Sequence, residues 1–260
     1  MTTVLTVDVG NSRVKLRLWG ARAAADLPVR GVERRLGKLL DGWREEGLSP
    51  DAALLTSVAT PERTRAIVRV LGDFCRSVVL DPEPPLENRY ERPEEVGRDR
   101  LYAASGAYVL LGRSAVVVDA GTALTVDALR VEGSKGVFCG GSIFPGPELL
   151  AQALARRTAK LPRFVPEPWG RACGRSTLDA LRGGVALGFR GAASWLVESL
   201  AREAEIEQAP VVLTGGARRF LLEPFPFTER ELRVEPDLVA VGLLVSGGFG
   251  ELLDSREERG

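Results

Sequence analysis

The chain alternates between short runs that are typical of β-strands and longer runs whose apolar residues recur at helical spacing. The strand-like runs cover residues 52–58, 77–80, 137–143 and 211–214. The helical runs cover residues 32–43, 61–71, 99–111, 147–157, 177–204 and 238–253. Thr60 and Pro61 are typical of a helix start, and Gly112 is typical of a helix end. This interleaving predicts a layered α/β protein.

One pattern occurs twice and divides the chain. Residues 5–12 read LTVDVGNS and residues 116–123 read VVVDAGTA, so each is an apolar run that ends in Asp-x-Gly before Asn or Thr. Each is followed directly by a second strand-like run. We therefore predict two glycine-turned β-hairpins in two related domains, residues 1–112 and 113–260.

The first hairpin carries groups that are suited to phosphate binding. Gly10 lets backbone amides approach a phosphate closely, while Asn11 and Ser12 add hydrogen-bond donors. Asp8 is placed to hold a magnesium ion through water, and Lys15 to reach a phosphate oxygen. Taken alone, the motif is equally typical of an ordinary β-turn. The second copy favours phosphate, because a pair of such hairpins can hold a triphosphate from two sides.

A third motif, VVLTGGA at residues 211–217, is a strand that opens into two glycines before a helix. Such a turn lets an adenosine lie against the backbone, although an ordinary strand-to-helix turn has the same pattern.

Charge and composition argue against several classes of protein. The 35 basic and 35 acidic residues cancel, so we expect no general attraction to nucleic acid or to anionic membranes. With no apolar run near the ~18 residues of a membrane span and no signal-peptide pattern, a cytoplasmic location is expected. The chain has no histidine, so acid–base chemistry has to use carboxylates, lysines or tyrosines. Cys75, Cys139 and Cys173 form no paired motif and are predicted to be buried free thiols.

In this order, the three motifs resemble the phosphate-one, phosphate-two and adenosine motifs of the acetate and sugar kinase, heat-shock chaperone and actin superfamily. Within it, the chain resembles the type III pantothenate kinases over nearly its whole length. Further matching segments are GRDR at 97–100, GGSIFPG at 140–146, RRTAKLP at 156–162, GRST at 174–177 and GGVALG at 183–188. The resemblance implies two ribonuclease H-like domains with a nucleotide cleft between them. It also implies ATP-dependent phosphorylation of pantothenate to 4′-phosphopantothenate, the first step of coenzyme A biosynthesis.

The same resemblance implies roles for individual residues. Asp99 matches the catalytic base, and a carboxylate suits this role in a chain without histidine; capping of its helix is the alternative. The resemblance implies that ATP is bound by Thr122 and by one continuous segment. That segment is Asp8, Val9, Gly10, Asn11, Ser12, Arg13, Val14 and Lys15. Asp119 matches the ligand of a monovalent cation, K⁺ or NH₄⁺, and Mg²⁺ would accompany ATP. The residues implied to hold pantothenate are Tyr90, Gly97, Arg98, Asp99, Arg100 and Thr177.

Arg100 is able to pair bidentately with a carboxylate, with a surface salt bridge as the alternative. Two residues depart from the family pattern. Arg98 stands where a small residue is usual, and its charge is expected to keep Asp99 ionised while making it a weaker base. Leu124 stands where a second small residue is common, which puts some contacts near the phosphates in question.

Because the family is dimeric with its acceptor pocket at the subunit interface, the resemblance also implies a homodimer. Three alternative functions remain open on the sequence. They are a kinase for another small hydroxyl compound, a regulatory relative of the accessory-factor type, and an actin-like filament protein.

Overall fold

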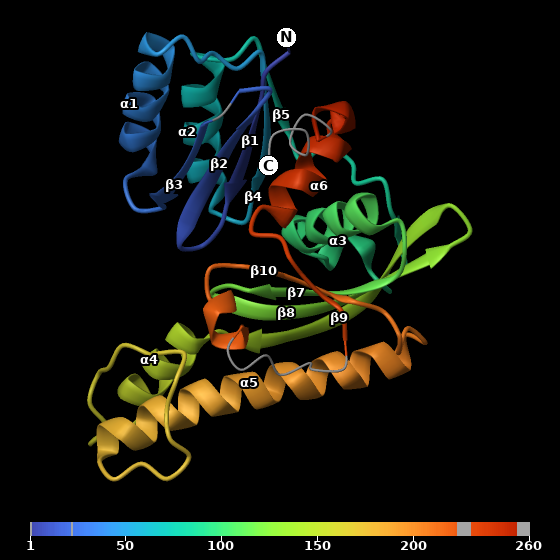
Figure 1. Ribbon diagram of the computed structural model, residues 1–260. Helices are drawn as coiled ribbons and strands as arrows, with labels where there is room; N and C mark the ends of the chain where they lie inside the picture. The colour runs from blue at the N-terminus through green and yellow to red at the C-terminus, as the bar shows by residue number, and fades with distance from the viewer. Residues whose placement is uncertain (1, 22, 223–229, 254–260) are drawn as a thin grey trace. The chain divides into compact units, whose positions relative to one another are not determined.

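The computed structural model describes residues 2–21, 23–222 and 230–253 (Figure 1). The chain forms two compact units, and each is described by itself. The first unit comprises the chain through Leu86, Arg92–Leu110 and the chain from Asp237 onward, and the second comprises Glu87–Glu91 and Leu111–Pro236. The division at residue 111 lies beside the expected boundary at Gly112. The predicted second domain, 113–260, differs from the second unit at its end, because the chain from Asp237 belongs to the first unit.

The first unit is built on a five-stranded sheet with the order β3-β2-β1-β4-β5. Its strands are β1 (Val4–Val9), β2 (Arg13–Trp19), β3 (Ala23–Pro28), β4 (Ala52–Ser57) and β5 (Ser77–Leu80). Its helices are α1 (Val32–Glu45), α2 (Pro61–Gly72), α3 (Arg98–Leu111) and α6 (Leu238–Ser246), with short 3₁₀ helices at η1 (Pro93–Glu95) and η3 (Gly250–Leu252). Strands β1, β2 and β3 are antiparallel neighbours, whereas β1, β4 and β5 run parallel.

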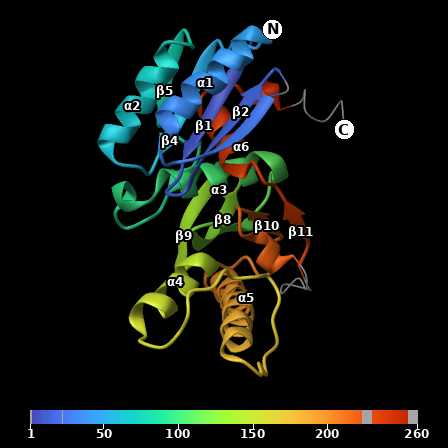
Figure 2. The same cartoon turned by 90° about the vertical axis from the view of Figure 1, so that its left-hand side faces the viewer.

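Alternating side chains divide the first unit's core between the two faces of this sheet. Ala53 and Leu55 of β4 pack in the cluster that contains the buried residues of α1 and α2. Leu54 points to the opposite face, where it lies against Gly247 at the end of α6. Figures 1 and 2 show α1 and α2 on one side of the sheet and α6 on the other.

The C-terminal segment joins the first unit because α3 and α6 cross with their backbones in contact. A Cβ atom at Gly106 would collide with the carbonyl oxygen of Leu238, and one at Gly242 would collide with the carbonyl oxygen of Tyr102. Glycine is the residue that permits so close an approach. The sequence of α6 is apolar all round, so its periodicity did not indicate which layer it would cover. The predicted helix 238–253 was also too long, since α6 ends at Ser246.

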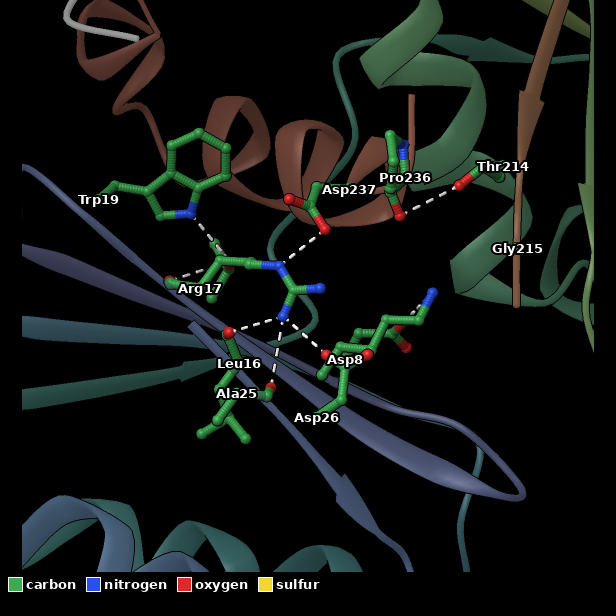
Figure 3. Close-up of polar contacts among 12 residues, drawn as sticks. Asp8, Leu16, Arg17, Trp19, Ala25, Asp26, Thr214, Gly215, Pro236 and Asp237 are labelled. Atoms are coloured by element: carbon green, nitrogen blue, oxygen red, sulfur yellow. Dashed lines mark hydrogen bonds and ion pairs between the residues drawn. The ribbon is translucent and has the colours of Figure 1, made fainter. Parts of the chain in front are cut away.

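Arg17 in β2 ties the first unit's sheet to the start of α6 (Figure 3). Its Nε donates to Asp237 Oδ1 at 2.7 Å, and its Nη1 donates to Asp26 Oδ1 and to the Leu16 carbonyl oxygen, both at 2.8 Å. Burial lowers the pKa of Arg17, but the hydrogen bonds and charges of the two aspartates outweigh burial and raise it. Arg17 therefore stays charged and holds the residue that immediately precedes α6.

The second unit repeats this plan. Its six-stranded sheet has the order β11-β10-β7-β8-β9-β6. Its strands are β6 (Glu87–Asn88), β7 (Ala115–Ala120), β8 (Ala123–Glu132), β9 (Lys135–Pro145), β10 (Val211–Thr214) and β11 (Leu232–Val234). Its helices are α4 (Pro147–Arg157) and α5 (Thr177–Glu203), with a 3₁₀ helix at η2 (Arg218–Leu221). Across the sheet, β9-β8-β7-β10-β11 correspond in order and relative direction to β3-β2-β1-β4-β5 of the first unit. Strand β6 is an additional edge strand beside β9.

Helix α5 packs along one face of the second unit's sheet (Figure 1). Its buried residues Phe189, Ala193, Val197 and Ala201 recur every fourth position and join the core cluster of β7, β8 and β10. The pattern of the sequence thus predicted α5 well, but it gave no indication of β3, β6 or β11. Among the residues that the structure describes, no helix is both long enough and apolar enough to cross a membrane.

The three cysteines differ in exposure, and this yields a test of the fold. Cys75 is buried, Cys139 is half-buried and Cys173 is exposed, so the prediction that all three are buried was wrong for Cys173. Burial raises the pKa of Cys75 to about 11, because the thiolate is disfavoured away from water.

With a thiol reagent at pH 8, we expect rapid labelling of Cys173 and labelling of Cys75 only after denaturation. A Cys173→Ser variant should lose the rapid phase, and rapid labelling of Cys75 in the native protein would contradict this packing.

Candidate active site

The first hairpin places a carboxylate and an ammonium group beside its turn. Asp8 and Lys15 are register partners in β1 and β2, and Lys15 Nζ lies 4.0 Å from Asp8 Oδ2. The turn between them is closed by the Gly10 N–H, which donates to the Arg13 carbonyl oxygen at 2.9 Å. Asn11 is exposed at the tip of the turn. The geometry expected from the Asp-x-Gly motif is therefore present, with polar groups of both charges at one end of the sheet.

The second hairpin has the same form with a shorter turn. Ala120 pairs with Leu124, and Gly121 N–H donates to the Ala123 carbonyl oxygen at 2.9 Å. Leu124 is 0% exposed and belongs to the core cluster under α5. Its side chain is directed into the core, so this departure from the family pattern does not place a leucine side chain among the turn's polar groups.

The adenosine-like motif lies directly against the second hairpin. Thr214 pairs with Asp119, and Ala217 N–H donates to the Ala120 carbonyl oxygen at 2.7 Å. Gly215 has φ +93°, and a Cβ atom there would collide with the Ala120 carbonyl oxygen and the Asp119 carboxylate. Two motifs about ninety residues apart in the sequence therefore meet at one edge of the second unit's sheet.

Thr122 is held from the other side by the segment that the sequence singled out at 140–146. Gly146 N–H donates to the Thr122 carbonyl oxygen at 3.0 Å, and α4 begins at the next residue, Pro147. The turn from β9 into α4 therefore packs on the second hairpin. This contact explains why the 140–146 segment accompanies the hairpin motif.

Asp99 lies in the first turn of α3 in the first unit. Its Oδ1 accepts a hydrogen bond from the Arg100 N–H at 2.9 Å, and a Cβ atom at Gly97 would lie 2.6 Å from the same oxygen. A carboxylate in the first turn is favoured by the helix dipole, so a helix-end role and a chemical role are compatible. Arg98 donates to Glu83 Oε2 at 2.9 Å, so its charge is paired with a carboxylate other than Asp99.

Arg100 is 6% exposed, so its side chain does not lie on the surface. Tyr90 belongs to the second unit, where its ring packs beside Phe138 with the ring centroids 6.4 Å apart. Thr177 is the first residue of α5 and follows Ser176, whose Oγ accepts from the Asp179 N–H at 3.1 Å. The predicted acceptor residues thus come from both units.

Asp8 and Asp119 each offer a single carboxylate, which suits an ion that takes its remaining ligands from phosphate or water. In the described parts of the chain, no group of three or more His, Cys, Asp or Glu side chains is arranged to hold a metal ion. Magnesium bound with a nucleotide needs only one or two protein carboxylates, because phosphate and water oxygens complete its shell. Asp8 fits that requirement. Asp119 provides one carboxylate, which lies close to the backbone at Gly215.

Sequence reasoning missed the ion pairs that fix the surrounding segments. Arg17 bonds to Asp237, 220 positions away, and Arg89 bonds to Glu132, 43 positions away. The sequence carries no local signal for pairs so distant.

Solved structures with the same architecture identify the class of fold. A putative Baf family transcriptional activator from Campylobacter jejuni is 19% identical with a TM-score of 0.58, covering 98% of this chain and 99% of that chain. An archaeal actin homologue is 11% identical with a TM-score of 0.56, covering 95% of this chain and 99% of that chain. At these identities the similarity concerns the fold alone, which is the two-domain, actin-like ATPase fold.

Sequence comparison then identifies the family. A family model described as type III pantothenate kinase matches residues 4–199. The type III pantothenate kinase of Thermus thermophilus is 38% identical over 256 residues, covering 93% of this chain and 97% of the relative. That of Rubrobacter xylanophilus is 35% identical over 260 residues, covering 93% and 96%. The chain belongs to the type III pantothenate kinase family.

The contact at Gly215 can be tested with a neighbouring glycine as the control. Gly215→Ala should lower the free energy of unfolding by roughly 1–3 kcal/mol, since the methyl group meets backbone and the φ value is strained. Gly216→Ala should cost little, because no atom lies within 4 Å of a Cβ atom there. Urea denaturation of both variants measures the difference. Equal stabilities would show that the turn after β10 does not lie this close to the end of β7.

Proposed function

We propose that the protein transfers the γ-phosphoryl group of ATP to pantothenate, which gives 4′-phosphopantothenate for coenzyme A biosynthesis. Membership of the type III pantothenate kinase family carries this proposal. The family match spans residues 4–199, so it includes both hairpins and the start of α3.

ATP binding is assigned to the first hairpin, from Asp8 to Lys15, and to Thr122 of the second. Turn amides left outside the strand ladder are suitable donors to phosphate oxygens, and Lys15 adds a positive charge beside them. Magnesium, held with the help of Asp8, would neutralise part of the charge on the transferred group. The monovalent cation, K⁺ or NH₄⁺, is assigned to Asp119.

Asp99 is assigned the role of general base. As the oxygen of pantothenate's primary hydroxyl forms its bond to the γ-phosphorus, the bond from that phosphorus to the β,γ-bridging oxygen breaks and ADP leaves. The hydroxyl proton passes to the Asp99 carboxylate. The Arg100 N–H, 2.9 Å from Asp99 Oδ1, orients the carboxylate, and pairing of Arg98 with Glu83 separates the Arg98 charge from it.

Pantothenate binding is assigned to Tyr90, Gly97, Arg98, Asp99, Arg100 and Thr177. Arg100 is the proposed partner of the pantothenate carboxylate, because a guanidinium can pair bidentately with a carboxylate. A homodimer working in the cytoplasm is part of the same proposal, and it rests on the family resemblance.

The base assignment predicts that Asp99→Asn lowers kcat by roughly 10²–10⁴-fold, since the amide does not accept the hydroxyl proton. Nucleotide binding and the melting temperature should stay near wild type, because Asn also accepts the Arg100 N–H. A coupled assay of ADP release with pantothenate and magnesium-ATP measures the effect.

Glu62→Gln is the matched control, because Glu62 lies in the first turn of α2. This substitution, like Asp99→Asn, removes one negative charge from the start of a helix. Full activity in Glu62→Gln together with collapse in Asp99→Asn supports the base. Wild-type protein that binds nucleotide but turns over no pantothenate would favour the regulatory alternative.

The cation assignment predicts that turnover requires K⁺ or NH₄⁺ and that Asp119→Asn raises the concentration needed for half-maximal activity about tenfold or more, the effect of losing one charged ligand. Titration of each chloride salt at constant ionic strength, with NaCl as the balance, measures this requirement. An unchanged cation dependence in Asp119→Asn would place the cation elsewhere.

A further inference from the structure

The segment that carries Tyr90 is weakly held by its own backbone. Glu87–Glu91 belongs to the second unit, although the chain on both sides of it belongs to the first. Only Glu87 and Asn88 form a strand, β6, which pairs with β9 at the edge of the sheet. The Arg89 N–H adds a hydrogen bond to the Phe138 carbonyl oxygen at 3.0 Å. An edge strand this short leaves the following residue dependent on side-chain contacts for its orientation.

The Arg89 side chain supplies such contacts. Its Nη1 and Nη2 donate to the two carboxylate oxygens of Glu132 at 2.8 and 2.7 Å, and its Nε donates to Glu87 Oε1 at 2.6 Å. Glu132 ends β8, and β9 lies between β8 and β6 in the sheet. The guanidinium therefore links the edge strand to the next strand but one, with three of its donors engaged by two carboxylates.

Glu132 accepts hydrogen bonds from two arginines, Arg89 and Arg130. Hydrogen bonds from Arg89 and then Arg130 lower the pKa of Glu132 to about 2. Arg130 Nε donates to Glu132 Oε1 at 2.7 Å. Both residues belong to β8, so this bond does not link β8 to β6. Exposed single ion pairs contribute little, but a bidentate pair within a network of charges is the recognised exception.

Tyr90 follows Arg89 directly and lies on β9. Its N–H donates to Asn88 Oδ1 at 3.1 Å, and its ring is tilted 45° against the Phe138 ring. Gly140 has φ +112°, and a Cβ atom there would lie 3.7 Å from the edge of the Tyr90 ring. The Tyr90 ring therefore lies against Phe138 and Gly140 of β9, and the residue before it is Arg89.

We infer that Arg89 is a positioning residue, which through Glu132 and Glu87 holds Tyr90 on β9 in the orientation that contacts the acceptor. This inference rests on the proposed function, which assigns Tyr90 to pantothenate binding. Arginine suits the role because its planar fork engages both carboxylate oxygens while Nε reaches a second carboxylate. Lysine, as a point charge, does not reproduce that geometry.

Kinetics provide the first test. Arg89→Gln should raise KM for pantothenate roughly tenfold, the usual effect of losing charge-assisted hydrogen bonds, with KM for ATP and the melting temperature unchanged. Arg89→Lys should show an intermediate rise. Glu132→Gln should match Arg89→Gln, and the double variant should show no further rise. Arg130→Gln is the control, because it removes the other arginine of Glu132 and should leave KM for pantothenate unchanged.

Fluorine NMR provides a second test that needs no turnover. The chain has three tyrosines, so full-length protein labelled with 3-fluorotyrosine should give three signals, and Tyr90→Phe assigns one. In Arg89→Gln, but not in Arg130→Gln, the Tyr90 signal should sharpen and move toward the unfolded position, while the other two stay in place.

The two tests separate this inference from the proposed function. An unmoved Tyr90 signal, or a moved signal with unchanged KM for pantothenate, overturns the positioning role. Equal rises in KM for ATP and for pantothenate also overturn it, because a general structural defect has that effect. Wild-type protein that does not phosphorylate pantothenate refutes the proposed function, and the NMR result then still decides whether Arg89 orients Tyr90.

Discussion

In each unit one strand, β1 or β7, pairs with an antiparallel neighbour on one side and a parallel neighbour on the other. A tight turn must therefore leave the carboxyl end of this strand, and the parallel neighbour must end at the same edge. The turn residues at that edge lie outside the ladder, and Asn11 among them is exposed. Asp8 and Asp119 lie at this edge because each is the last residue but one of its strand.

Close backbone contacts then bring separate segments to these edges. Gly215 lets the turn after β10 lie on the end of β7, and the glycines where α3 and α6 cross let the C-terminal helix join the first unit. These contacts place the adenosine-like turn beside Asp119 and fix α3, whose first turn carries Asp99. The chemistry assigned to the protein thus depends on positions where a side chain would not fit.

Two arginines hold segments that make few hydrogen bonds within the sheets. Arg17 holds the residue before α6, and Arg89 holds the edge strand before Tyr90, each through two carboxylates from different elements. Both networks lie where the chain passes from one unit to the other. There, few ladder hydrogen bonds are available, so charge-assisted bonds with defined geometry take their place.

The two hairpins, the strand at 211–214 and the helices α1 to α5 were predictable from the amino-acid sequence, because glycine turns, helix caps and apolar periodicity are local signals. The sequence also indicated the family through motifs whose order is preserved along the chain. Three features became visible only in the folded chain: α6 belongs to the first unit, β6 adds an edge strand, and Leu124 points into the core. Sheet edges, helix crossings and ion pairs such as Arg89 with Glu132 join residues far apart in the sequence, so no local pattern records these contacts.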